Sequence, residues 1–183
     1  SLEDRLREVL KRYEDRSRDL ERELKRVLDE YDDSSRKVAE ELKKVLDEIR
    51  ETVERIKKDV DEKDLRRIKE LLKRLEEEVK RTVDENRREA EEIKRKVKKE
   101  TDENRREADE RRRDLERRKG KPRREKEVAD LVKKLEDDLR RTSDKVRRVV
   151  EEIKRRLEEL ERRYKALVKK LRDKLREIKE EVR

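Results

Sequence analysis

The sequence predicts an all-α protein: a single-chain, antiparallel, up-down-up three-helix bundle of long, nearly straight helices, in effect an untwisted coiled coil. Apolar residues recur about every 3.6 positions along almost the whole chain, which is the period of an α-helix. They also repeat every 18 residues, or five turns of an undistorted helix. In the last third the 18-residue spacing relates Val128 to Val146, Tyr164 and Val182, and Leu135 to Ile153 and Leu171.

The first helix is predicted over residues 1–60. Its stripe keeps the helical period from Leu2 to Val60, and the hydroxyl of Ser1 can cap its start. The stripe lapses over 61–64 and resumes one position out of phase at Leu65. We therefore expect a turn there, although no Gly or Pro marks it; the alternative is one unbroken helix over 1–118.

The second helix is predicted over 65–118, with Asp64 as its N-terminal cap. Gly120 and Pro122 then form the only strong break in the chain, since Gly favours the position after a helix and Pro the first turn of the next. The third helix is predicted over 123–183. The near-equal lengths of the three segments favour the turn at 61–64.

The spacing also predicts the shape of the bundle. A strict seven-residue repeat would wind the helices around each other, whereas a period of 3.6 keeps them nearly straight. Each helix would be roughly 80–90 Å long at a rise of 1.5 Å per residue. We expect residues 1–183 to form one elongated domain.

The composition limits the class of protein. Charged residues make up 65% of the chain and hydrophobic residues 28%, which is too little apolar material for an ordinary globular core but close to two positions in seven, as in a coiled coil. Cys, His, Met, Phe, Trp and Gln are absent, and Gly and Pro occur once each. The motif Asp-Glu-Asn-Arg-Arg-Glu-Ala occurs at 84–90 and again, letter for letter, at 102–108.

These features resemble computationally designed (de novo) parametric helical bundles, specifically untwisted three-helix bundles with 18-residue repeats. The resemblance covers the whole chain and rests on the repeat, the duplicated motif, the missing residue types and the charged fill of the exposed positions. It implies a stable structural scaffold without biological activity. The first loop departs from such designs because it lacks explicit loop residues.

Polar residues interrupt the apolar stripes and are the first candidates for a site. We interpret them as register control, since a buried Asn disfavours slipped pairings. If the first two helices meet at 61–64, Tyr13 and Tyr31 lie near the small residues Ala108 and Ala90, and their hydroxyls could bond to Asn104 and Asn86. The interrupting residues are Ser17, Ser35, Asn86, Thr101, Asn104 and Thr142.

No catalytic, cofactor-binding or metal-binding residue is predicted, and we expect no enzyme and no cofactor. Metal sites in bundles use inward Glu and His side chains, but His is absent and no stripe position carries a carboxylate. Ser, Thr and Tyr have no His or Cys beside them to activate a nucleophile.

The net charge of +9 raises the question of a polyanion partner. Basic residues cluster at the second turn, where we also expect Arg111 to fray its helix. We interpret the cluster as charged surface without aromatic residues for base stacking, and expect at most weak, non-specific nucleic-acid binding. The cluster contains Arg111, Arg112, Arg113, Arg117, Arg118, Lys119, Lys121, Arg123, Arg124 and Lys126.

We therefore expect a designed, thermostable scaffold that is a monomer with no specific partner. The alternative is a natural-type coiled-coil interaction or spacer protein with weak polyanion binding. A membrane-surface protein is disfavoured, because its apolar face would need bulky aromatic residues. No signal peptide or membrane-spanning segment is visible, so we expect a soluble protein, produced by recombinant cytoplasmic expression.

Overall fold

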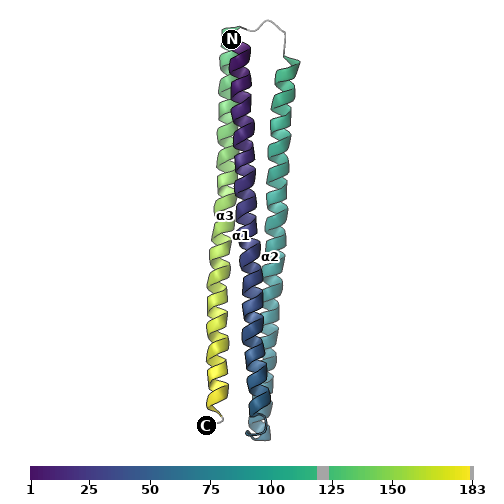
Figure 1. The fold of residues 1–183 in the computed structure, drawn as a ribbon, viewed down its shortest axis with the longest axis vertical. Helices are drawn as coiled ribbons and strands as arrows, with labels where there is room; N and C mark the ends of the chain where they lie inside the picture. The colour runs from purple at the N-terminus through teal and green to yellow at the C-terminus, as the bar shows by residue number, and fades with distance from the viewer. Residues whose placement is uncertain (119–123, 182–183) are drawn as a thin grey trace. The chain divides into compact units, whose positions relative to one another are not determined.

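The protein is all-α and consists of three long helices that pack against one another, as predicted (Figure 1). The computed structural model describes residues 1–118 and 124–181, apart from the side chain of Leu2. The helices are α1 (Leu2–Ile56), α2 (Glu62–Arg117) and α3 (Glu125–Glu180), and the described residues contain no strand. An unbroken helix over 1–118 is therefore wrong.

The turn between α1 and α2 begins earlier in the chain than residues 61–64, where the turn was predicted. Helix α1 ends at Ile56 rather than at residue 60, and the Asp59 N–H donates to the carbonyl of Ile56 at 2.9 Å. The cap of α2 is Asp61, whose carboxylate accepts the N–H of Asp64 at 2.8 Å, so the predicted cap at Asp64 is wrong. This choice places the acidic groups of Glu62 and Asp64 in the first turn, where they favour the positive end of the helix dipole.

The other helix ends fit the prediction more closely. The Ser1 hydroxyl accepts the N–H of Asp4 at 3.3 Å, which confirms the predicted cap of α1. Helix α2 ends at Arg117, one residue before the predicted end, and α3 begins at Glu125 and ends at Glu180. The predicted turn at Gly120 and Pro122, the predicted start of the third helix at 123 and its predicted end at 183 lie outside the described residues.

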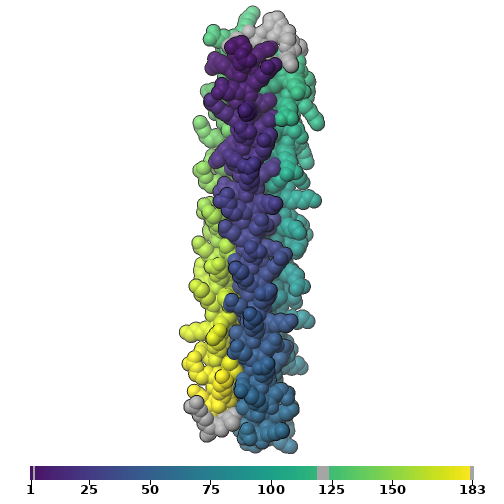
Figure 2. Space-filling model, in the orientation of Figure 1, coloured from purple at the N-terminus to yellow at the C-terminus, as the bar shows by residue number. Residues whose placement is uncertain are grey.

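The chain divides into two compact units, and each contains one segment of every helix. Unit 1 comprises Ser1–Asp29 and Ile93–Lys154, and unit 2 comprises Glu30–Glu92 and Arg155–Arg183. In unit 1 the α1 segment lies against both α2 and α3, as the space-filling view shows on one face (Figure 2). The expectation that 1–183 is a single domain stays a prediction.

Ion pairs between helices define the direction of the chain in unit 1. Glu14 of α1 pairs with Arg112 of α2, and Glu21, seven residues later, pairs with Arg105, seven residues earlier. The two helices are therefore antiparallel. Ser17 on α1 and Ala108 on α2 lie between these two ion pairs along their helices.

The α2 and α3 segments of unit 2 are antiparallel by the same criterion. From α2 to α3, Glu92 pairs with Arg156, Glu89 with Arg163 and Glu78 with Lys170. Residue numbers fall along α2 as they rise along α3. Together with the antiparallel pairing of α1 and α2, this arrangement confirms the predicted up-down-up order.

The apolar stripes form the core of each unit. In unit 1 the side chains of Leu6, Leu20 and Leu24 are almost fully buried, as are Val128 and Leu135 of α3. Leu42, Ile49, Ile68, Leu75 and Leu171 are buried in unit 2. Burial of these side chains is the main favourable term in folding.

The cap at Asp61 leads to a test. Replacing Asp61→Ala removes the acceptor for the Asp64 N–H, and we expect a loss of about 1 kcal/mol of unfolding free energy, as for other N-caps. Urea denaturation followed by circular dichroism measures it. The control is Asp59→Ala in the same turn, because the exposed Asp59 side chain has no hydrogen bond or ion pair among the described residues. Equal losses in the two variants would contradict this assignment of the cap.

Candidate functional site

Seven polar or charged side chains are buried among the described residues, and they are the candidates for a site. Four of the six predicted interruptions are among them: Ser17, Asn86, Asn104 and Thr142. Ser35 and Thr101, the other two, are only half-buried. The remaining buried polar residues are Thr52, Glu100 and Asp138.

The sequence interpretation missed the two buried carboxylates. Glu100 and Asp138 are 7% and 8% exposed, and each directly precedes a predicted stripe residue, Thr101 or Leu139. An apolar stripe on a bundle helix is wide enough to bury positions beside its centre, and this is the signal that would have found them. Thr52 lies on such a flank as well, and its hydroxyl is satisfied by the carbonyl of Glu48 at 2.8 Å.

In unit 1 a polar layer joins all three helices around Tyr13. The Thr142 hydroxyl on α3 donates to the Glu107 carboxylate on α2 at 3.1 Å. Burial raises the pKa of the Tyr13 phenol, and a hydrogen bond with Thr142 opposes this rise. The prediction that Asn104 is the partner of this phenol is therefore wrong. It considered only α1 and α2, and Thr142 belongs to α3.

An ion-pair cluster lies beside this layer. Arg111 on α2 approaches Asp138 on α3 at 2.7 Å, and Asp138 also accepts a hydrogen bond from Arg141 at 2.7 Å. Arg111 lies within α2 and its side chain is only 25% exposed, so the expected fraying at this residue is wrong. The reason is that the buried carboxylate of Asp138 supplies a charge partner that the sequence pattern did not reveal.

Unit 2 contains a related layer around Tyr31. Burial raises the pKa of the Tyr31 phenol, and the negative charge of Glu89 raises it further. Arg163 of α3 pairs with Glu89 at 3.3 Å. The Tyr31 hydroxyl has no hydrogen-bond partner among the described residues, so the predicted bond to Asn86 is also wrong.

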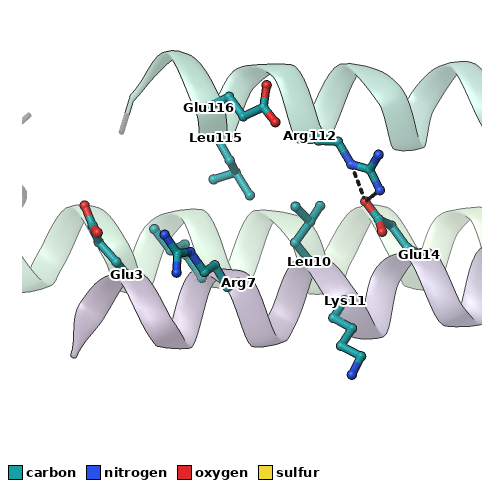
Figure 3. A pocket seen from close by; sticks show the side chains of 9 residues that line it. Glu3, Arg7, Leu10, Lys11, Glu14, Arg112, Leu115 and Glu116 are labelled. Carbon is teal, nitrogen blue, oxygen red and sulfur yellow. Dashed lines mark hydrogen bonds and ion pairs between the residues drawn. The ribbon is translucent and has the colours of Figure 1, made fainter. Parts of the chain in front are cut away.

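Unit 1 also contains an open groove of about 370 Å³ between α1 and the end of α2. Figure 3 shows Leu10 and Leu115 pointing toward one another across it, with the Arg112–Glu14 ion pair to one side. Its other labelled residues are charged side chains at the rim. Leu6, Leu10 and Leu115 supply the apolar contacts of the groove, and its other lining side chains are carboxylates and cations, among them the paired Glu14 and Arg112.

The buried layers include contacts between helices, Thr142–Glu107, Arg111–Asp138 and Arg163–Glu89, and these contacts can align the helices. Within 1–118 and 124–181, no group of three or more acidic, His or Cys side chains could hold a metal ion. None of the described helices includes an apolar stretch sufficient for a membrane span. No protein-family model, curated protein or solved structure matches the chain.

The buried phenols predict a loss of stability at alkaline pH. An unfolded tyrosine ionises near pH 10, whereas the folded-state pKa of Tyr31 is raised. The associated stability is complete below pH 10 and is lost as the pH rises toward the folded-state pKa, by up to about 1.4 kcal/mol at pH 11. We expect Tyr31→Phe to reduce the fall in unfolding free energy between pH 9 and pH 11, measured by urea denaturation. Tyr164→Phe, at a half-buried ring, is the control, and the expectation fails if Tyr31→Phe leaves the slope unchanged.

The buried asparagines predict a different response. Asn104 Nδ2 has no hydrogen-bond partner among the described residues, so its amide is desolvated without compensation. Replacing both Asn86→Leu and Asn104→Leu should preserve or raise thermal stability, and loosen specificity into mixed oligomers. Thermal denaturation and light scattering after size exclusion measure the two effects. A large destabilisation would instead show that the amides belong to a complete hydrogen-bonded network.

Proposed function

We propose that the chain is a designed structural scaffold whose purpose is to fold and hold its three helices in register. The observation that carries this proposal is that the same pair of neighbours, a buried tyrosine of α1 and a half-buried glutamate of α2, occurs once in each unit. Tyr13 and Tyr31 are 18 residues apart on α1, and each lies next to a glutamate of α2, Glu107 or Glu89. These glutamates occupy the same position in the two identical copies of the seven-residue motif.

The asparagines support the same reading. Asn86 and Asn104 occupy one shared position of the duplicated motif and are 5% and 4% exposed. Five turns of an undistorted helix bring such positions back to the same side, so a repeated sequence can produce a repeated layer. Layers of this kind favour one register over slipped alternatives, which is a common device of design.

Apolar burial repeats with the same spacing. Leu6, Leu24 and Leu42 follow one another at intervals of 18 residues and are at most 2% exposed. Leu135, Ile153 and Leu171 have the same spacing on α3 and are at most 4% exposed. A chain selected only for binding has no physical need for such regularity, whereas a parametrically generated backbone produces it directly.

The second candidate is a coiled-coil interaction or spacer protein with weak polyanion binding, favoured by the basic residues near the end of α2. Several of these cations already have carboxylate partners: Arg111 pairs with Asp138, Arg112 with Glu14 and Arg118 with Asp114. Lys119, Lys121 and Arg123 lie outside the described residues. Binding of a short DNA duplex at about 50 mM salt that is lost at about 200 mM would favour this candidate, because weak binding that rests on phosphate contacts falls steeply over that range.

Thermal denaturation tests the scaffold proposal. The stability rests on apolar burial, with no disulfide and no His to titrate, so the helical circular dichroism signal should survive heating well beyond the mesophile range at neutral pH. Cooperative loss of helix below about 60 °C would count against a design made for stability. Stoichiometric binding of a ligand that is abolished by Asn86→Leu with Asn104→Leu would overturn the absence of a functional site.

A further inference from the structure

The α2 segment of unit 1 is unevenly attached. Its buried apolar side chains, Ile93 and Val97, both lie at its beginning. From Lys98 to Arg117, all of which the structure describes, no apolar side chain is buried. The buried positions of this stretch are instead Glu100 and Asn104.

The partner helices in the same unit are apolar. On α1, Leu6, Tyr13 and Leu20 are at most 2% exposed, and on α3 Val128 and Val146 are fully buried. Lys98–Arg117 therefore covers part of an apolar α1–α3 surface with polar side chains. Its own apolar residues there, Ala108 and Leu115, stay half-buried.

Polar contacts hold this segment in place. It pairs with α1 through Arg112–Glu14 at 2.7 Å and Arg105–Glu21 at 3.1 Å. It contacts α3 through Arg111–Asp138, Thr142–Glu107 and Lys145–Glu103, the last at 2.6 Å. Arg105 and Lys145 are more than half exposed, so these pairs contribute little and are screened by salt.

Unpartnered atoms weaken the attachment further. Asn104 Nδ2, Glu100 Oε2 and Arg111 Nε have no hydrogen-bond partner among the described residues. Glu100 Oε2 keeps an ion pair with Lys145 Nζ at 3.6 Å, but this distance is too long for a hydrogen bond. Buried polar atoms without a partner destabilise the docked state, because water would satisfy them after separation.

The α2 segment of unit 2 provides the contrast. Glu62–Glu92 buries Ile68, Leu75 and Val79, together with Asn86. Each asparagine follows the last buried apolar side chain of its segment, Val79 or Val97, by seven positions, but the stretch without apolar burial covers 80–92 in unit 2 and the longer range 98–117 in unit 1. The unit 1 segment is therefore the less firmly docked of the two, because it buries fewer apolar side chains and its stretch without them is longer.

We propose that Lys98–Arg117 detaches as a unit while α1 and α3 of unit 1 stay paired, and that the uncovered face binds an amphipathic helix. The occupant is a helix with the α2 sequence but with leucine in place of Glu100 and Asn104. It keeps Arg111, because the buried carboxylate of Asp138 on α3 needs a cation. This helix would bind as helices do in apolar grooves: its apolar stripe would cover the α1–α3 face that the polar side chains of Lys98–Arg117 cover in the closed state.

Hydrogen exchange on the full chain tests the detachment. The amides of residues 100–107 are at least ten residues from the end of α2, so fraying of the last turn does not reach them. We expect them to exchange about tenfold faster than α1 amides at the same distance from a helix end, in the low-stability range of local opening. Raising the salt from about 50 to 500 mM should accelerate only this segment. Uniform, salt-independent protection across unit 1 would overturn the proposal.

Two variants sharpen this measurement. Glu100→Leu with Asn104→Leu should slow exchange at 100–107 to the level of α1, because both added side chains are apolar at buried positions. Asn86→Leu with Thr82→Leu, the equivalent changes in unit 2, is the matched control and should leave the exchange of 100–107 unchanged. If the double variant fails to fold, the salt dependence of the unsubstituted chain still decides the question.

A peptide tests the uncovered face. The probe is a fluorescent peptide of residues 93–117 carrying Glu100→Leu and Asn104→Leu, and its anisotropy is followed as the full chain is added. It should bind at least about tenfold more tightly than the unsubstituted peptide, which must compete with an identical tethered segment at high effective concentration. The full chain carrying the same two leucines should bind the probe more weakly. Equal binding of both peptides, or none, would overturn the docking surface.

Discussion

The shortage of apolar residues is the constraint on which the rest of this structure depends. With 28% hydrophobic residues, each helix has one stripe, and that stripe must meet the stripes of two partners. Most of the charged residues remain exposed, where single ion pairs contribute little to stability. Helix direction and register therefore decide whether enough apolar area is removed from water.

The two tyrosine layers show how one local problem is solved in two ways. In unit 1, Thr142 connects the Tyr13 phenol to Glu107. The residue 18 positions after Thr142 is the buried, apolar Leu160, so no equivalent hydroxyl is present. In unit 2 the charge of Glu89 is balanced by Arg163 instead. The carboxylate at the repeated α2 position is thus hydrogen-bonded by a hydroxyl in unit 1 and paired with a guanidinium in unit 2, and these two partners come from different positions of the 18-residue repeat on α3.

The sequence predicts what depends on one helix at a time and loses accuracy where a third helix contributes. Periodicity predicts three helices and the burial of Ser17, Asn86, Asn104 and Thr142. It does not predict which aspartate caps α2, because Asp61 and Asp64 are both capable acceptors in a stretch without Gly or Pro. The burial of Asp138 and the partner of Tyr13 depend on side chains from other helices, which a single stripe cannot specify.

In helix α2, helical content and the strength of docking against the other helices differ along the chain. Its backbone is helical from Glu62 to Arg117, because Glu, Lys and Arg are strong helix formers. Its docking is not uniform, since burial of apolar side chains stops at Val97 in unit 1. Polar residues at buried positions favour one register, but they reduce the free energy that attaches the helix. In a long bundle helix, local stability therefore follows the distribution of buried apolar side chains and not the helical content.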